Sequence, residues 1–235
     1  MGGAPLWRWL AAAGLALVLV QGVAWGRWAL SPPILDSRSH GLAVAGGVSF
    51  ARSLAPFGAD HQTHSTADAA LGRQYLHSDV VDTLQAAFAE ERAGSLGRGR
   101  HAPRWRVAET GWRGGGWFSP HLTHQDGLSV DIVTPLQAGR LPSWPWQELG
   151  YGLELDPVGA FGEQAVEFDR LARLFDGLCR QAPKHGLVTR ALIVWGPWHP
   201  AIRGRMRSTC RNTLIDAPLP HDDHVHVTFT PKGAR

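Results

Sequence analysis

The segment 224–229, His-Val-His-Val-Thr-Phe, alternates polar and apolar residues without a break. Side chains of a β-strand alternate between the two faces of a sheet, so Val225, Val227 and Phe229 share one face. The two imidazoles and the threonine share the other face. We expect the valine face to enter a core and the imidazole face to border a cleft. The competing interpretation is a polar outer strand face that happens to hold two histidines.

Glycine and proline limit the fold class further. The chain has 28 Gly and 16 Pro among 235 residues, which predicts many turns and long loops instead of a helical bundle. Apolar periodicity predicts a helix that starts near Tyr75, capped by Ser78-Asp79, and a second at 163–181. Further strands are expected at 104–108, 128–133 and 191–195. This mixed order favours an α+β fold with a small central antiparallel sheet, flanking helices and long loops.

The first 26 residues have the features of an export signal. Arg8 precedes an uncharged apolar stretch, and Gly22 and Ala24 have the spacing that a signal peptidase accepts. The alternative is an uncleaved inner-membrane tether through residues 9–26. In either case we expect the remainder of the chain in the periplasm.

Two further segments are expected after the signal. Residues 27–65 are expected to form a linker or loosely packed N-terminal segment, with His61 and His64 at its surface. Residues 66–235 are expected to form one peptidase-sized domain. The net charge of +3 includes no run of five like charges, which argues against a nucleic-acid partner. The sequence does not indicate an oligomeric state.

The chain has two cysteines, which excludes a disulfide-rich scaffold and a four-cysteine zinc site. In an exported protein, a disulfide between Cys179 and Cys210 is favoured over two free thiols. The bridge would close a loop of about 30 residues and stabilise the fold by roughly 3–4 kcal/mol in the chain-entropy model.

A second histidine-rich segment, 119–132, ends in another alternating strand. Asp131 lies on the polar face of that strand, where burial is costly unless the carboxylate is paired or binds a metal. His124 precedes it across Gly127, which permits a sharp turn that folds the imidazole back. Together with one histidine of the last strand, these residues would supply two nitrogens, one oxygen and an open position. That donor set is typical of catalytic zinc, here on a sheet face.

Competing site classes are less consistent with the pattern. A cupin-like barrel also uses His-x-His to bind metal, but it requires many short strands and not two helical stripes. In the zinc interpretation, the other imidazole of the last strand is within reach of a zinc-activated water.

The motifs resemble a known family. The pattern His121-x-x-His124-Gln-x-Gly-Leu-x-Val-Asp131-Ile, with His221-Asp-x-His224-x-His226, is similar to the penicillin-insensitive murein endopeptidases. These belong with lysostaphin and D-Ala-D-Ala carboxypeptidases in the LAS-type group of zinc peptidases. Arg113-Gly-Gly and Tyr75-x-His77 also fit, and the resemblance covers roughly residues 75–229. Departures at positions 120, 123 and 129 fall on no inferred ligand.

The resemblance implies a ligand set and a general base. It implies His124, Asp131 and His226 as ligands of Zn²⁺, with His224 as general base or transition-state stabiliser. Asp223 is a rival base because the related dipeptidases carry a glutamate at that relative position. An odd number of residues separates Asp223 from His226, so in a strand it would face away.

The remaining implied site residues concern the substrate. His221, grouped with the catalytic residues, and His121 would line the site, and Arg113 is a candidate for binding a substrate carboxylate. The implied activity is zinc-dependent hydrolysis of D-alanyl-meso-diaminopimelate cross-links between the stem peptides of peptidoglycan, through a metal-activated water. The alternatives are a D-Ala-D-Ala carboxypeptidase or dipeptidase of the same group, or a non-catalytic cell-wall-binding protein.

Overall fold

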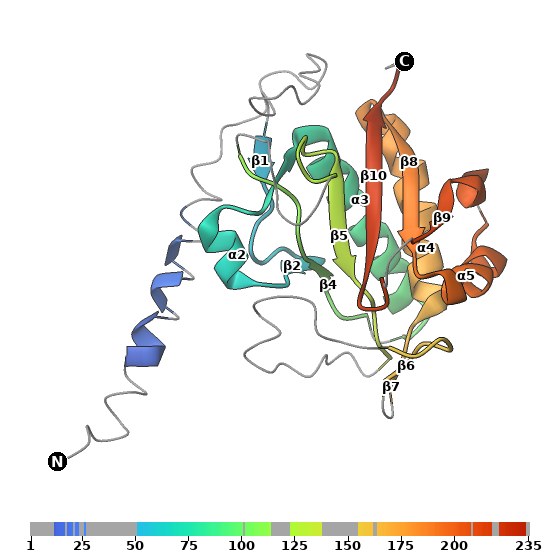
Figure 1. The fold of residues 1–235 in the computed structure, drawn as a ribbon, viewed down its shortest axis with the longest axis horizontal. Helices are drawn as coiled ribbons and strands as arrows, with labels where there is room; N and C mark the ends of the chain where they lie inside the picture. The colour runs from blue at the N-terminus through green and yellow to red at the C-terminus, as the bar shows by residue number, and fades with distance from the viewer. Residues whose placement is uncertain are drawn as a thin grey trace.

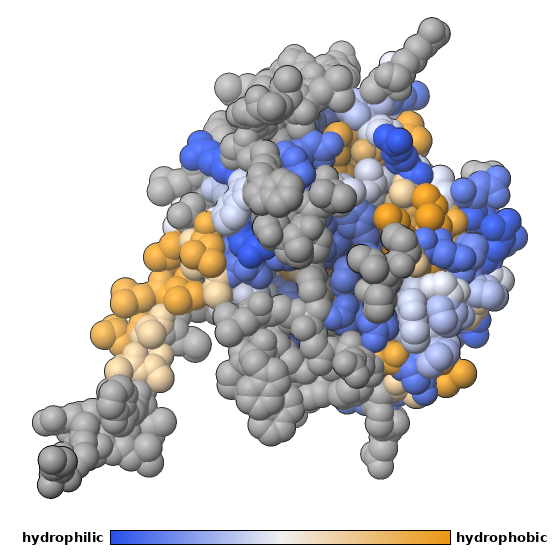
Figure 2. Space-filling model, in the orientation of Figure 1, coloured by the Kyte–Doolittle hydropathy of each residue, from blue (hydrophilic) through white to orange (hydrophobic). Residues whose placement is uncertain are grey.

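The computed structural model describes residues 51–100, 102–113, 123–137, 155–161, 164–207, 209–217 and 221–233. It also describes helical residues 12–16, 18–20, 22–23 and 26 near the N-terminus, whose exposed side chains include Leu15, Val18 and Leu19. Figure 2 shows this N-terminal helical segment as hydrophobic. No helix in the described part of the chain combines the length and the apolar character that crossing a membrane requires.

A mixed six-stranded sheet organises the fold, in the order β2-β4-β5-β10-β8-β9 (Figure 1). Its strands are β2 (His61–Thr63), β4 (Trp105–Val107), β5 (Ser129–Val133), β10 (His224–Pro231), β8 (Leu187–Val194) and β9 (Leu214–Asp216). The four inner strands pair antiparallel, whereas the outer pairs β2–β4 and β8–β9 are parallel. The expected antiparallel sheet is therefore the centre of a larger mixed sheet, and the chain is a mixed α/β fold.

Smaller elements surround this sheet. Two further strand pairs form, β1 (Ala51–Ser53) with β3 (Tyr75–His77) and β6 (Ala160–Phe161) with β7 (Gln164–Ala165). The α-helices are α2 (Thr66–Leu71), α3 (Ser78–Leu96), α4 (Phe168–Gln181) and α5 (His199–Arg205). Short 3₁₀ helices are η2 (Ala182–His185), η3 (Gly196–Trp198) and η4 (Thr209–Thr213).

The core lies between the sheet and the long helices α3 and α4, which pack together behind the sheet in Figure 1. Val225, Val227 and Phe229 of β10 are completely buried in one apolar cluster with Leu174 and Phe175 of α4. Their burial confirms the alternation expected for this strand. It also fixes the other face of β10, which carries His224, His226 and Thr228, on the side away from the helices.

Both predicted helices start later than expected. Residues 75–77 form β3 and pair with β1, so α3 begins at Ser78. His77 caps this helix in place of Ser78, because its Nδ1 accepts a hydrogen bond from the Asp79 amide at 3.3 Å. Helix α4 begins at Phe168, because residues 164–165 pair with residues 160–161 in a short hairpin.

Residues 51–65, within the expected linker, belong to the folded body. They contribute β1, β2 and Ser65, whose hydroxyl accepts a hydrogen bond from the Asp68 amide and caps α2. The expectation that His61 lies at the surface is wrong, since only 4% of the surface of this residue is exposed to solvent. Pairing of β2 with β4 places the imidazole near Phe88, with ring centroids 6.0 Å apart. His64 is half-buried.

The expected disulfide between Cys179 and Cys210 is present, with the two Cα atoms 6.2 Å apart. It connects α4 to η4, which precedes the edge strand β9. The bridge closes a sequence separation of 31 residues, and both cysteines pack against the apolar core. Of the two alternatives left open by the sequence, the bonded pair is the one observed.

Candidate metal centre

His124, Asp131 and His226 converge on the face of the sheet opposite the helices. Asp131 on β5 and His226 on β10 are direct cross-strand partners, and His124 reaches them from the turn that precedes β5. One potential ligand atom from each residue lies within 4.8 Å of the others. All three residues are buried, and Asp131 and His124 are completely inaccessible to solvent.

The tautomer of His124 is set by a backbone carbonyl. Its Nδ1 lies 2.9 Å from the Thr110 oxygen, which can only accept, so Nδ1 carries the proton and donates it. In the neutral ring the Nε2 lone pair then faces Asp131 Oδ2, 3.2 Å away. A histidine held by a backbone carbonyl with its free nitrogen toward a carboxylate has the outer-shell arrangement of metal-ligating imidazoles.

His226 is held in a network that tolerates either tautomer. Its Nδ1 lies 2.7 Å from Asp131 Oδ1, and its Nε2 lies 3.0 Å from the Thr228 hydroxyl. That hydroxyl is in turn 3.1 Å from the Ser129 hydroxyl. Because a hydroxyl both donates and accepts, Thr228 can accept a hydrogen bond from Nε2–H and leave the Nδ1 lone pair for a cation.

The electrostatics favour an ionised Asp131. Burial alone would raise the pKa of this carboxyl, but the charge and hydrogen bond of His124 and the hydrogen bond of His226 hold it well below its usual range. Burial likewise opposes a charged His124, yet the adjacent Asp131 carboxylate raises the pKa of that imidazole. Burial lowers the pKa of His226. A buried carboxylate between two imidazoles therefore needs a positive charge beside it.

These residues fit a divalent metal. Two imidazole nitrogens and a carboxylate oxygen form the donor set of catalytic zinc sites with an open position. The donors are buried, their orientation is fixed by Thr110 and Thr228, and the two imidazoles hold the pKa of the carboxyl well below its usual range. A group of this kind could hold a metal ion.

A second group of imidazoles adjoins the three candidate ligands. His224, two residues before His226 on the same strand face, places Nε2 4.0 Å from Asp131 Oδ2. Its Nδ1 lies 2.6 Å from Asp223 Oδ1, and its ring lies 4.7 Å from that of His221. Burial opposes protonation of His224, but the Asp223 hydrogen bond and the nearby Asp131 carboxylate raise its pKa above the ordinary value.

Asp223 precedes β10 and is not part of it, so the strand alternation does not govern its direction. Its carboxylate contacts the ring of His224 and does not join the three-residue ligand group. The two rival bases of the sequence analysis are thus a hydrogen-bonded pair, in which Asp223 orients His224.

The turn that carries His124 depends on two glycines. Gly127 has a φ of 69°, in the left-handed region that side chains disfavour, and its carbonyl accepts a bond from the His77 amide. Gly111 lies against the turn from the other side. A Cβ at position 111 would come within 2.7 Å of the His124 carbonyl oxygen, so the close approach requires glycine.

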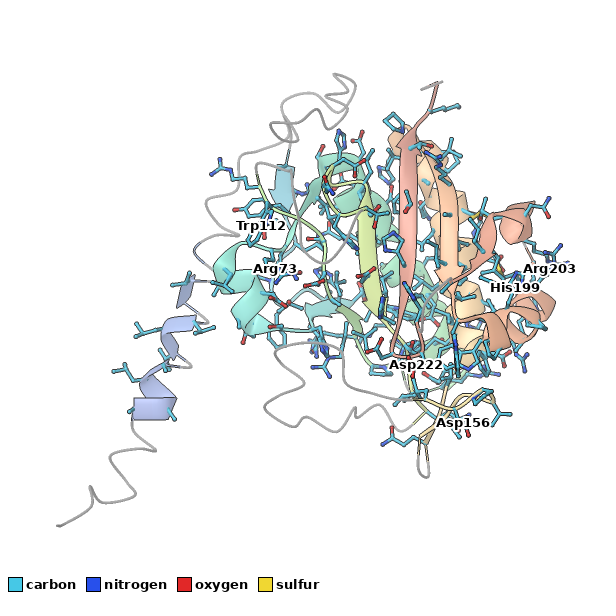
Figure 3. All side chains as sticks on the ribbon, viewed as in Figure 1. Arg73, Trp112, Asp156, His199, Arg203 and Asp222 are labelled. Carbon is cyan, nitrogen blue, oxygen red and sulfur yellow. A yellow bond between two sulfur atoms is a disulfide. The ribbon has the colours of Figure 1, made fainter. Side chains whose placement is uncertain are left out.

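Two other residues were expected to contact the substrate. Arg113 is exposed, whereas His121 lies outside the described residues. Trp198 is buried in the core. Trp112 lies beside Arg73, whose Cζ is 5.6 Å from the ring centroid (Figure 3).

Sequence reasoning missed two groups that orient the candidate ligands. Thr110 acts through its backbone carbonyl, for which residue type gives no signal. Thr228 lies two residues after His226 on the same strand face, so its period-two position is a usable signal.

A search with family models and a search of curated proteins found no match to this chain.

Proposed function

We propose that this protein is a zinc-dependent murein endopeptidase that hydrolyses D-alanyl-meso-diaminopimelate cross-links in peptidoglycan. The observation that carries the proposal is the convergence of His124, Asp131 and His226 within 4.8 Å on one buried sheet face. The spacing of these residues also resembles that of the murein endopeptidases. An exported enzyme acting on the cell wall is consistent with the signal-like N-terminus.

The residues of the chain have distinct roles in this proposal. His124 Nε2, Asp131 and His226 Nδ1 would hold the ion. When bound, zinc polarises a scissile carbonyl and lowers the pKa of water toward ~7. His224 accepts a proton from the attacking water at Nε2 and returns it to the leaving amine, while Asp223 fixes the ring through Nδ1.

This chemistry requires no acyl-enzyme intermediate. Because water is the nucleophile and no serine is acylated, β-lactams have no serine to trap. Resistance of the activity to penicillin is therefore expected.

The test is digestion of purified peptidoglycan with the full-length protein, followed by mass spectrometry of the muropeptides. Loss of cross-linked dimers that persists in penicillin, stops with chelator and returns with Zn²⁺ supports the proposal. His226→Ala should abolish both zinc retention and cleavage. His199→Ala is the matched control, since this imidazole pairs with Asp216 away from the site.

The same experiment distinguishes the alternatives. Dimers that survive while pentapeptides lose a terminal D-alanine would indicate the carboxypeptidase. Protein that sediments with peptidoglycan without releasing products would indicate a wall-binding module. Either result overturns the endopeptidase proposal, and full zinc content in His226→Ala would overturn the ligand assignment.

A further inference from the structure

A hollow lies on the outer side of the helix layer, separate from the metal centre. It has a volume of about 500 Å³ and is lined from α3, α4 and the end of α5. Its charged lining residues are Glu90, Glu91, Arg98, Arg100, Asp169, Arg173, Asp176, Arg180, Arg205 and Arg207. The candidate metal ligands lie on the opposite face of the sheet, so the two sites are independent.

Helical spacing explains how these side chains come together. Asp169, Arg173, Asp176 and Arg180 follow one another at intervals of four, three and four residues along α4, so they share one helix face. The apolar stripe of α4 occupies another face and enters the core. The charged faces of α3 and α4 thus meet beside each other, away from the sheet.

The two α3 carboxylates in the lining are already bound. Glu91 has a completely buried side chain and pairs with Arg170 and Arg173, each at 3.1 Å. Glu90 accepts a hydrogen bond from Arg180 Nε at 3.0 Å and another from the Gln181 amide at 2.8 Å.

The two carboxylates of α4 are bound as well. Asp176 is buried and accepts bonds from the backbone amide of Arg207 at 3.2 and 2.9 Å, which leaves that guanidinium unused. Asp169 pairs with Arg205 at 2.9 Å and with Arg100 at 4.0 Å. No lining carboxylate therefore remains to neutralise further arginines.

The result is a surplus of guanidinium groups around the hollow. Six arginines and four carboxylates line it, a net charge of 6 − 4 = +2. Arg98 and Arg207 are exposed and form no ion pair within the described part of the chain. Guanidinium forks bind phosphate oxygens in bidentate fashion, and the volume is that of a small-molecule site.

We propose that this arginine-rimmed pocket binds a ligand that carries two or more phosphate groups. The phosphates belong either to a soluble compound or to a lipid headgroup, since both present the same oxygens. Arg98 and Arg207 contact the phosphates, and Arg173 and Arg180, held by the two glutamates, form the wall.

Isothermal titration of the full-length protein with inorganic pyrophosphate tests the pocket. The wild type should bind pyrophosphate saturably. The double variant Arg98→Gln/Arg207→Gln should bind at least about tenfold more weakly, because each substitution removes charge-assisted hydrogen bonds to the phosphates. Arg203→Gln is the matched control, an exposed α5 arginine outside the pocket, and should bind like the wild type (Figure 3). Unfolding midpoints verify that the variants are folded.

Three results overturn the proposal. These are absence of saturable pyrophosphate binding, equal weakening in Arg203→Gln, and equally tight binding of citrate, which carries carboxylates only. Flotation with phosphatidylcholine vesicles, with and without cardiolipin, whose headgroup carries two phosphates, identifies the source. Cardiolipin-dependent binding that weakens in the double variant supports a lipid headgroup, and vesicle binding that is the same with and without cardiolipin supports a soluble ligand.

Discussion

Asp223→Asn tests whether the hydrogen bond between Asp223 and His224 serves catalysis. The carboxylate Oδ1 lies 2.6 Å from His224 Nδ1, and both residues are at most 9% exposed. This contact directs Nε2 toward the candidate metal ligands. Asparagine preserves the shape of the side chain but removes its charge, and its amide can donate to Nδ1 and shift the proton to Nε2.

The expected magnitude follows from the type of contact that is lost. A hydrogen bond to a charged group contributes about 1.5–3 kcal/mol, and here both partners are shielded from water. Because each 1.36 kcal/mol of barrier is a factor of ten in rate, kcat should fall about 10- to 150-fold. KM should change little, since the pair acts in the proton transfer and not in substrate binding.

The assay is steady-state cleavage of cross-linked muropeptide dimers, with zinc content measured on the same samples. Asp222→Asn is the matched control, because it makes the same change one residue away. Asp222 accepts a hydrogen bond from the Leu155 amide at 2.9 Å and lies two residues before β10 (Figure 3). We expect this control to retain kcat.

Two outcomes would refute the reasoning. Unchanged kcat in Asp223→Asn would mean that the orientation of His224 is irrelevant, and loss of zinc would mean that Asp223 supports the ligands. A double-mutant cycle adds a sharper criterion. In a His224→Ala background, Asp223→Asn should have no further effect on kcat if the two residues act as a unit.

Three further predictions concern other parts of the molecule. Thr228→Val should weaken zinc binding about 10- to 100-fold in a chelator competition, because it removes the partner of His226 Nε2, whereas Thr230→Val should not. Burial lowers the pKa of His61, so the unfolded chain binds a proton that the folded chain does not, and stability is lost as pH falls below the ordinary value of 6.5. His61→Gln should therefore flatten the change in urea midpoint between pH 7.5 and 5.5, and an unaltered difference would contradict this. Replacing Cys179 and its partner by serine should lower the free energy of unfolding by roughly 4 kcal/mol, given the 31-residue separation, and a loss below 1 kcal/mol in urea unfolding would contradict it.

The sequence predicted β5 and β10 well because their alternating patterns extend over five or more residues. The alternation from His224 to Phe229 covers six residues, enough to assign faces, and the faces are those observed. By contrast, β2 and β9 have three residues each, too few for a period to be visible. Their parallel pairing with β4 and β8 depends on long-range contacts, so the outer strands and the buried position of His61 could not be predicted.

Some features of the candidate site could likewise be predicted from the sequence, and others could not. Gly127 signalled the local turn that returns His124 to β5, and its φ of 69° confirms that turn. The Thr110 carbonyl that holds His124 had no signal, because any residue type supplies a carbonyl. The alternation argument does not apply to Asp223, because this residue precedes the strand, and its carboxylate contacts the ring of His224.

The core and the candidate metal centre depend on the same strand register. Val227 pairs with Val130 and His226 with Asp131, so the pairing that puts valines against the helices also puts the imidazole opposite the carboxylate. A slip of one residue would turn every side chain of β10 to the other face, exposing the valines and burying the histidines among apolar groups. Burial of the apolar residues of β5 and β10 therefore specifies the register. Burying the Asp131 carboxylate alone would be unfavourable, but this register places imidazoles beside it. A substitution that weakens the valine face should thus loosen metal binding even though it contacts no ligand.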